Sequence, residues 1–217
     1  MKLMAQNVLI LGAAGQIARI VTQNLLSHTD TNLVLYGRNL SSRITITDPN
    51  REKIVDGDFN DSQTLAHALQ EIDIVYLNSM SSEKDTLNII ATLKKQGIKR
   101  IVGATIIGIY DEFGEKIGKW TKQNLSSTYI DEEIRSAKAV EQSGLEYTLL
   151  RLAWLYNDPQ NHHFKLIPKD QTVNDVQVTR QAVADAIAKI VTYDQDYINK
   201  SFAVVEPNTA FDKPSFY

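Results

Sequence analysis

The sequence predicts an α/β fold in which a doubly wound parallel sheet forms a single domain. Apolar runs of strand length alternate with helical patterns along the 217 residues, and no repeat or linker interrupts them. The first apolar run, residues 8–11, is continuous, as in a parallel strand buried on both faces. The glycine-rich stretch 12–18 follows it at once and lets the backbone turn into a helix.

The first half of the chain supplies most of this sheet. Apolar runs predict strands at 7–11, 33–36, 52–56, 73–78 and 100–105. Helical spacing predicts helices at 15–27, 61–70 and 83–96, with a short turn or helix near 40–44. Asp61 is expected to cap the second of these helices.

The second half is expected to be less regular. A long loop follows residue 105, and a helix at 129–143 is ended by Gly144. A strand at 146–151 precedes an irregular segment that reaches about residue 179. A helix at 180–193 and a strand at 201–205 complete the layout.

Composition limits the classes of function. The chain has no cysteine, which excludes a disulfide framework, thiolate catalysis and Cys-ligated metal sites. Its 23 basic and 26 acidic residues are well mixed, unlike the basic footprint of a nucleic-acid binder. Residues 1–6 do not resemble a signal peptide, and no apolar stretch approaches the roughly 18 residues of a membrane span. We expect a cytoplasmic monomer or homodimer that takes a small-molecule substrate and binds neither nucleic acid nor membrane.

The turn at 12–18 predicts a binding site for the pyrophosphate of a dinucleotide. Small residues after a buried strand leave the first N–H groups of the next helix facing outward, where they can bind an anion. The spacing here is Gly-x-x-Gly-x-x-Ala, which differs from the Gly-x-Gly-x-x-Gly fingerprint. An ordinary glycine-rich turn is therefore the alternative.

Arg38 indicates NADP(H) in preference to NAD(H). It follows the strand at 33–36, where an NAD-specific protein usually has an acidic residue for the ribose 2′-hydroxyl. A guanidinium pairs with a 2′-phosphate through charge-assisted bonds, whereas an acid would repel it. The alternative is a solvated surface arginine. Arg43 could be a second phosphate contact, but we expect it on an exposed turn.

Further binding residues are expected where the other strands end, because ligands of doubly wound sheets bind at the carboxyl ends of the strands. Asp58 could accept a hydrogen bond from an adenine amino group, with Phe59 packed beside the ring. A turn or capping aspartate is an equally good interpretation of Asp58. For His162 and His163, a polar loop is favoured over a metal site, because no set of Asp, Glu or Cys completes the ligands.

Five segments carry a resemblance to a known family: residues 12–18, 36–39, 56–61, 143–151 and 178–184. They resemble the atypical, extended-type short-chain dehydrogenases of the NmrA-like and flavin-reductase-like kind. The resemblance implies one NAD(P)-binding Rossmann domain over residues 1–217, with 152–179 and 206–217 as substrate-side loop and tail. It implies NADP(H) contacts in four groups: Gly12, Ala14, Gly15, Gln16 and Ile17 at the glycine turn, Arg38 at the 2′-phosphate, Asp58 and Phe59 at the adenine, and Asn78 and Ser79 beside the nicotinamide ribose.

Three hydroxyl residues are the candidate catalytic groups. Members of the wider superfamily use a Tyr and a Lys four residues later, because a cation must lower a phenol pKa of about 10. Here Glu133 follows Tyr129 at that spacing, and its charge would oppose a tyrosinate. Thr105 stands where a hydroxyl partner is expected, and Tyr110 lies in the loop expected to border the nicotinamide. Thr105, Tyr110 and Tyr129 could each donate a hydrogen bond to a substrate.

These observations predict an NADP(H)-dependent oxidoreductase that reduces a small, planar acceptor such as a quinone or a flavin. The cofactor carries the difficult chemistry, and such an acceptor can take its proton from water. The alternative is a non-catalytic NADP(H)-binding redox sensor with a partner protein, which the missing lysine at 133 favours. A sugar-nucleotide epimerase fits less well, because the chain after Arg151 is short for a substrate domain. Trp120 and Trp154 could wall a substrate pocket or merely pack in loops, and the tail at 211–217 either closes a pocket or contacts another subunit.

Overall fold

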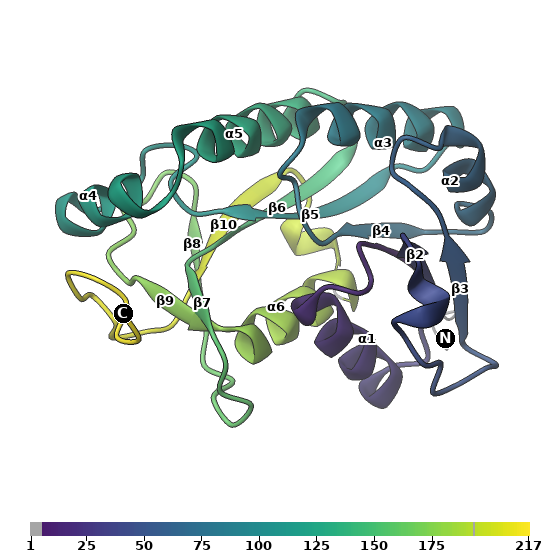
Figure 1. The fold of residues 1–217 in the computed structure, drawn as a ribbon, viewed down its shortest axis with the longest axis horizontal. Coiled ribbons are helices and arrows are strands. Elements are labelled where there is room, and N and C mark those ends of the chain that lie inside the picture. Colours follow the sequence, from purple (N-terminus) through teal and green to yellow (C-terminus); the bar gives the residue numbers. More distant parts are fainter. Residues whose placement is uncertain (1–5, 193) are drawn as a thin grey trace.

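A central β-sheet covered by helices on both faces organises the chain (Figure 1), as described by a computed structural model for residues 6–192 and 194–217. Within these residues the main sheet has eight strands. In spatial order they are β3 (Glu52–Asp56), β2 (Asn32–Gly37), β1 (Asn7–Leu11), β4 (Ile74–Leu77), β5 (Arg100–Ile106), β6 (Glu146–Leu152), β10 (Lys200–Val205) and β8 (Lys165–Pro168). Neighbouring strands are parallel except for β8, which runs antiparallel to β10.

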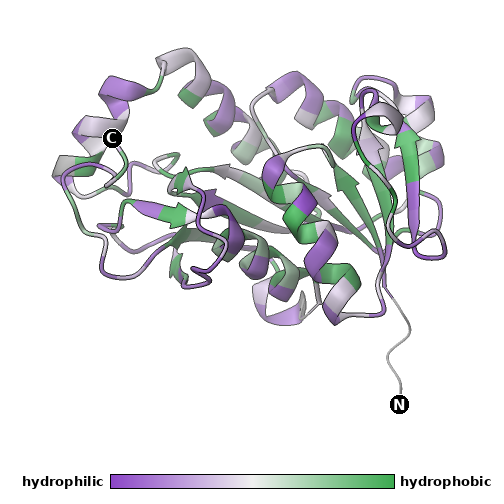
Figure 2. Ribbon diagram, turned by 60° about the horizontal axis from the view of Figure 1, so that its bottom comes forward, coloured by the Kyte–Doolittle hydropathy of each residue, from purple (hydrophilic) through white to green (hydrophobic). Residues whose placement is uncertain are grey.

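The helices divide between the two faces of the sheet. One face carries α1 (Gln16–His28) and α6 (Arg180–Thr192), and the other carries α2 (Ser62–Ala68), α3 (Glu83–Lys95) and α5 (Ser127–Glu141). Side chains of β1 alternate between two cores, with Val8 and Ile10 on the α1 side and Leu9 and Leu11 on the α3 side. This double burial explains the continuous apolar run at residues 8–11 of β1. Figure 2 shows the hydrophobic strands between two layers of helices, which carry hydrophilic residues outward.

The strand order confirms the predicted doubly wound fold. The chain moves outward from β1 through β2 to β3, then returns to the other side of β1 at β4 and continues to β5 and β6. The reversal between β1 and β4 is the switch point at which such sheets open a crevice at the carboxyl ends of the strands. No helix in the described part of the chain has the length and hydrophobicity needed to cross a bilayer.

The predicted strands and helices are present, with ends that differ by at most two residues. The Asp61 side chain accepts hydrogen bonds from the N–H groups of Gln63 and Thr64, so its capping role is confirmed. The short element near 40–44 is the 3₁₀ helix η1 (Leu40–Ser42), and a second one, η2 (Asp194–Tyr197), precedes β10. Residue 193 of the predicted helix 180–193 and residues 1–5 lie outside the described residues.

Two predictions of irregular structure were wrong. The expected long loop contains α4 (Glu115–Asn124), and the irregular segment contains β7 (Trp154–Tyr156), β8 and β9 (Gln177–Thr179). α4 begins after Gly114 without a side-chain cap, and Ile117 and Trp120 are its only large apolar residues, so it lacks both the usual start signal and a long apolar repeat. β7 and β9 have three residues each and form a separate parallel pair. Strands this short have no readable periodicity.

Candidate cofactor and acceptor site

A tight glycine turn joins β1 to α1. Gly12 has a positive φ of 82°, which glycine adopts readily, and its N–H donates to the Tyr36 carbonyl at 2.9 Å. A Cβ atom at Gly15 would lie 2.3 Å from Nδ2 of Asn78, so a larger residue would displace that side chain. α1 begins after Gly15 with no side-chain cap and no acidic residue in its first turn. Its first N–H groups are therefore available to an anionic group.

A pocket of about 390 Å³ opens between this turn and the ends of β2 and β3, and we call it the edge pocket. Its lining residues are Gly12, Ala14, Gly15, Gly37, Arg38, Leu40, Arg43, Gly57, Asp58, Phe59, Asn60, Ser81 and Asp85. Six residues of the predicted cofactor site are among them: Gly12, Ala14, Gly15, Arg38, Asp58 and Phe59. The elements thus bring together residues that lie up to 47 positions apart in the chain.

Arg38 and Asp58 form the charged part of the edge pocket. The Arg38 side chain is 78% exposed, and its Nε lies 3.9 Å from Oδ2 of Asp58. The pKa of Asp58 is lowered mainly by hydrogen bonds from the backbone and side chain of Asn60, and less by Arg38. Asp58 is therefore a turn aspartate that also lines the pocket. Arg43 is on the expected exposed turn and lines the same pocket.

Two interactions fix the shape of the edge pocket. The carboxylate of Asp56, at the end of β3, accepts a hydrogen bond from the Ser41 hydroxyl, and this bond is the main reason why the pKa of Asp56 is lowered. It holds the turn that follows Arg38. Phe59 stacks on the buried ring of Tyr36, with centroids 6.2 Å apart. Burial, with smaller effects from nearby carboxylates, raises the pKa of Tyr36 to about 12.

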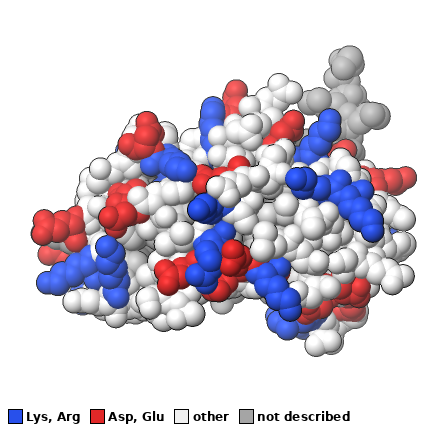
Figure 3. All heavy atoms as spheres, turned by 90° about the horizontal axis from the view of Figure 1, so that it is seen from above, with Lys and Arg blue, Asp and Glu red and all other residues white. Residues whose placement is uncertain are grey.

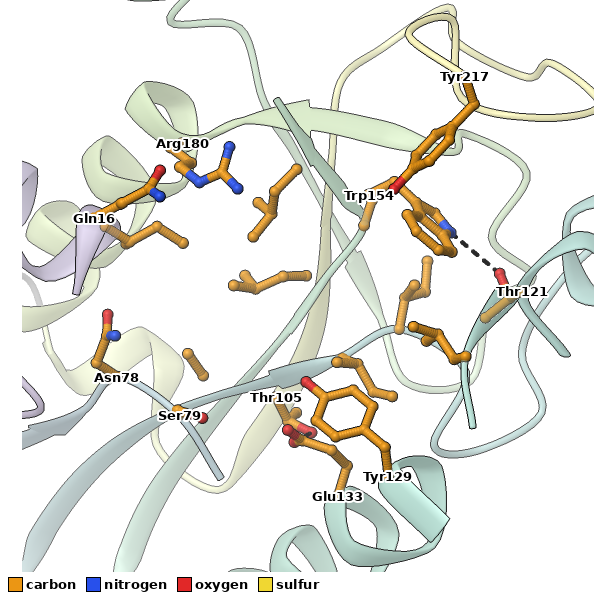
Figure 4. Close-up of a pocket in the computed structure, with 18 residues that line it drawn as sticks. Gln16, Asn78, Ser79, Thr105, Thr121, Tyr129, Glu133, Trp154, Arg180 and Tyr217 are labelled. Atoms are coloured by element: carbon orange, nitrogen blue, oxygen red, sulfur yellow. Dashed lines mark hydrogen bonds between the residues drawn. The ribbon is translucent and has the colours of Figure 1, made fainter. Parts of the chain in front are cut away.

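A second pocket of about 460 Å³ lies at the ends of β4, β5 and β6, and we call it the central pocket (Figure 4). Its lining residues are Gln16, Ile17, Asn78, Ser79, Ala104, Thr105, Ile106, Ile107, Thr121, Leu125, Tyr129, Glu133, Leu152, Ala153, Trp154, Leu155, Arg180 and Tyr217. Six of these were predicted as site residues: Gln16, Ile17, Asn78, Ser79, Thr105 and Tyr129. The two pockets meet at the glycine turn, because Gly15 lines one and Gln16 lines the other.

A hydroxyl and carboxyl cluster forms one side of the central pocket. Thr105 on β5 donates to Oε2 of Glu133 on α5 at 2.8 Å. Burial raises the pKa of Glu133, and its contacts with the Thr105 and Tyr129 hydroxyls offset part of that rise. The pKa of Tyr129 is raised as well, by burial first and then by Glu133. Figure 4 shows the Tyr129 hydroxyl directed into the cavity beside these two residues.

Aromatic rings form the opposite wall. Tyr217 packs edge-on against both tryptophans, with its ring 5.4 Å from Trp154 and 5.6 Å from Trp120. The indole N–H of Trp154 donates to the Thr121 hydroxyl at 3.2 Å, which ties β7 to α4. The preceding tail is held by the Ser215 N–H, which donates to the Gln177 side chain at 2.8 Å. The C-terminal tail thus reaches the central pocket, and Trp154 lines it while Trp120 supports it.

Tyr110 lies outside both pockets, contrary to the expectation that its loop borders the nicotinamide. The Glu112 carboxylate accepts hydrogen bonds from the N–H groups of Gly108 and Tyr110, each at 3.0 Å, and folds the loop back. The Tyr110 hydroxyl then donates to Glu141 at 2.8 Å, and its ring lies 4.0 Å from Nζ of Lys169. Burial is the main cause of its raised pKa.

Arg151 lies on the same side of the sheet as this loop. Its side chain is fully buried, pairs with the 3%-exposed carboxylate of Glu112 and donates to Ser201 at 3.1 Å. Arg151 therefore serves the packing of this loop and lines neither pocket. His162 contacts Asp185, with Nδ1 2.6 Å from Oδ2, and no cluster of three potential metal ligands occurs among the described residues.

Several central-pocket residues escaped sequence reasoning. Arg180 begins α6, donates to the Asn157 side chain at 3.0 Å and has a pKa lowered by burial. Figure 4 shows it beside Gln16 at the α1 end of the cavity. Thr121 comes from α4, the helix that sequence patterns did not reveal, and Leu125 is the residue directly after it. The available signal for Arg180 was its place in segment 178–184, one of the five that carry the family resemblance.

The model of the NAD(P)H-binding family matches residues 12–194 of the chain, from the first residue of the glycine turn to a point beyond α6. The chain belongs to this family. A short-chain dehydrogenase/reductase from Veillonella parvula, solved in complex with NADP, is 39% identical, with a TM-score of 0.95 over 98% of this chain and 100% of that one. A Rossmann-fold NAD(P)-binding family protein from Shigella flexneri is 31% identical, with a TM-score of 0.80 over 98% and 99% of the two chains.

Curated relatives are more distant. A phenylcoumaran benzylic ether reductase from Nicotiana tabacum is 25% identical over 154 residues, which are 65% of this chain and 46% of that protein. The chain spans less than half the length of the curated relatives it matches. Together the relatives establish an NAD(P)H-binding chain of an oxidoreductase family with a Rossmann fold.

Proposed function

We propose that the protein is an NADP(H)-dependent oxidoreductase that reduces a small, planar acceptor such as a quinone or a flavin. The observation that carries this proposal is the arrangement of two pockets that meet at the glycine turn, with Arg38 in one and the Thr105 cluster in the other. An extended dinucleotide needs such a path, with its pyrophosphate at a helix N-terminus and its two bases on either side.

The residues present fit NADP(H). The uncapped start of α1 and the space left by Gly15 suit a pyrophosphate. Asp58 and Phe59 would hold the adenine, and Asn78 and Ser79 would lie beside the nicotinamide ribose. When bound, NADPH supplies a hydride, and the chain binds, orients and shields the reacting groups.

Arg38 supports the preference for the phosphorylated cofactor. It is exposed and has only a 3.9 Å contact with Asp58, so its guanidinium can turn toward a 2′-phosphate with little loss. Arg43 lines the same pocket and adds a second positive charge. The presence of NADP in the Veillonella parvula relative is in keeping with this assignment.

The walls of the central pocket favour a flat acceptor. Aliphatic residues from β5 and β6 face an aromatic wall that includes Trp154 and Tyr217, and aromatic faces stack well on planar conjugated rings. We therefore assign residues 152–179 and 206–217 to the substrate side, where they supply part of this wall.

The test is NADPH oxidation by the purified chain with a panel of quinones, flavins and aldehydes, followed through nicotinamide absorbance. Binding of NADPH and NADH is titrated in parallel through the fluorescence of the reduced nicotinamide. Turnover with a conjugated acceptor supports the proposal and ranks the acceptor classes. Tight NADPH binding without turnover across the panel would instead favour the redox sensor, for which the absence of lysine at 133 is the specific argument.

A further inference from the structure

Glu133 is a buried carboxyl group in the wall of the central pocket. Its residue is 1% exposed, and it projects from α5 toward the end of β5, where the Thr105 hydroxyl donates to Oε2 at 2.8 Å. The Tyr129 hydroxyl, one helical turn earlier, lies beside the same carboxyl group (Figure 4), and a hydrogen-bonding contact between the two side chains contributes to both pKa shifts. Among the described residues, Glu133 has no basic side chain within ion-pairing distance.

A buried arginine on the same face of the sheet pairs with another carboxylate. Arg151 is the β6 neighbour of Thr105 in register, so it lies on the same face of the sheet as the Glu133 contact. Its guanidinium is directed away, toward Glu112, Ser201 and the carbonyl of residue 167. Among the residues that the structure describes, this face thus holds two buried carboxyl groups, Glu112 and Glu133, and one buried arginine, which pairs with Glu112.

The other charged groups around Glu133 are also engaged or distant. Arg135 on α5 is at the outer surface, where its Nε lies 3.0 Å from Glu83 of α3, and Figure 3 shows basic and acidic side chains interspersed over this outer face. The buried part of α3 is uncharged. Arg180 lies on the α6 side of the cavity and donates to Asn157. A buried carboxyl group without a counter-charge favours its neutral form.

We propose that Glu133 stores a proton and passes it to Tyr129, whose hydroxyl protonates the acceptor as it is reduced. This inference rests on the proposed function and adds a requirement to it, namely an acceptor whose oxygen or nitrogen becomes basic on reduction. It also explains how Tyr129 can act without a neighbouring lysine. Instead of a cation that stabilises a tyrosinate, the site offers an acid that keeps the tyrosine neutral.

The step balances in atoms and charge. The acceptor gains a hydride, which carries two electrons, from NADPH. Its oxygen or nitrogen forms a bond to the Tyr129 hydroxyl proton, and the O–H bond of that tyrosine breaks. The carboxyl proton of Glu133 moves to the Tyr129 oxygen in the same relay, which leaves a neutral tyrosine and a Glu133 carboxylate. Solvent protonates Glu133 again before the next turnover.

The decisive variant is Glu133→Gln, which keeps the shape of the side chain but has no acidic proton. With an aldehyde acceptor we expect kcat/KM to fall by about 100-fold, which is the lower end of the range of rate effects typical of a positioned general acid. With a quinone we expect a smaller loss, because water can protonate the weakly basic product. In the unmodified protein the rate should fall as pH rises through the raised pKa of Glu133, and the variant should lack this decline.

Controls separate this role from a structural one. Glu132→Gln changes the adjacent, partly exposed residue of the same helix and should keep the rate and its pH profile. NADPH affinity, measured by fluorescence, should be equal in all three proteins. If Glu133→Gln does not fold, Tyr129→Phe removes the hydroxyl and should lower the aldehyde rate by a similar factor.

An independent readout does not depend on turnover. The infrared difference spectrum between neutral and alkaline pH should contain the C=O band of a protonated carboxyl group that Glu133→Gln lacks. Unchanged rates and pH profiles in the Glu133 and Tyr129 variants would overturn the relay while the oxidoreductase function stands. Absence of turnover by the unmodified protein would overturn both.

Discussion

The buried pair of Arg151 and Glu112 offers a quantitative test of the structure. Arg151 is 0% exposed at its side chain and Glu112 is 3% exposed, so neither charge is hydrated. Glu112→Gln would leave a buried guanidinium with a neutral partner, a change that typically costs about 3–5 kcal/mol. We expect a loss in the upper half of this range. The two carboxylate oxygens of Glu112 accept from three donors, namely the Arg151 guanidinium and the N–H groups of Gly108 and Tyr110, whereas a glutamine side chain has a single acceptor oxygen.

The loss should be visible in both thermal and urea unfolding followed by far-ultraviolet circular dichroism. For a domain of this length each kcal/mol corresponds to about 2–4 °C, so the melting temperature should fall by about 8–20 °C. Glu146→Gln is the matched control, since Glu146 is exposed at the start of β6, and it should stay within about 0.5 kcal/mol of the unmodified protein.

A double variant separates the pair from its surroundings. Arg151→Met with Glu112→Leu removes both charges together, and a smaller loss than that of Glu112→Gln is expected, because no charge is left uncompensated. A loss below about 1 kcal/mol for Glu112→Gln alone would refute the view that this ion pair is desolvated and holds the loop.

Four other predictions concern the pockets. Arg38→Asp should weaken NADPH binding by about tenfold and NADH binding far less, and equal affinities in fluorescence titrations would remove Arg38 from the site. Burial raises the pKa of Glu133 in the folded state above its ordinary 4.5. The protonated carboxyl group therefore contributes its full stabilisation below pH 4.5, and this stabilisation is lost as pH rises through the raised value. The free energy of unfolding of Glu133→Gln in urea should depend less on pH. Gly57→Ala would place a Cβ 2.3 Å from the Tyr36 hydroxyl, so it should cost about 1–3 kcal/mol in urea unfolding and weaken NADPH binding. Tyr217→Ala should raise the KM of the acceptor and leave NADPH affinity unchanged in steady-state kinetics.

The sequence was most informative about residues whose positions depend on a local pattern and on the ends of the parallel strands. Continuous apolar runs identified the parallel strands, and residues directly after strand ends, such as Arg38 and Asn78, entered the pockets because parallel strands end at one edge. The signals failed where tertiary contacts decide. Tyr110 lies only a few residues beyond β5, but hydrogen bonds to Glu112 turn its side chain away from the site.

Burial was the other quantity that the sequence could not supply. Spacing placed Glu133 four residues after Tyr129, and an exposed glutamate there would simply oppose a tyrosinate. Its environment depends on Thr105, 28 residues earlier, and on the fact that Arg151 pairs elsewhere. The same residue therefore changes from an argument against catalysis into a candidate proton store once its neighbours are known.

The aromatic wall has a further consequence for how the chain can be observed. Its two tryptophans, Trp120 and Trp154, are 6.4 Å apart, and both belong to the acceptor half of the cleft. Intrinsic indole emission therefore reports on this half alone, because no tryptophan lines the edge pocket. Quenching by an acceptor, or energy transfer to a reduced nicotinamide, would register occupancy of the central pocket directly, so the protein carries its own local probe and needs no label.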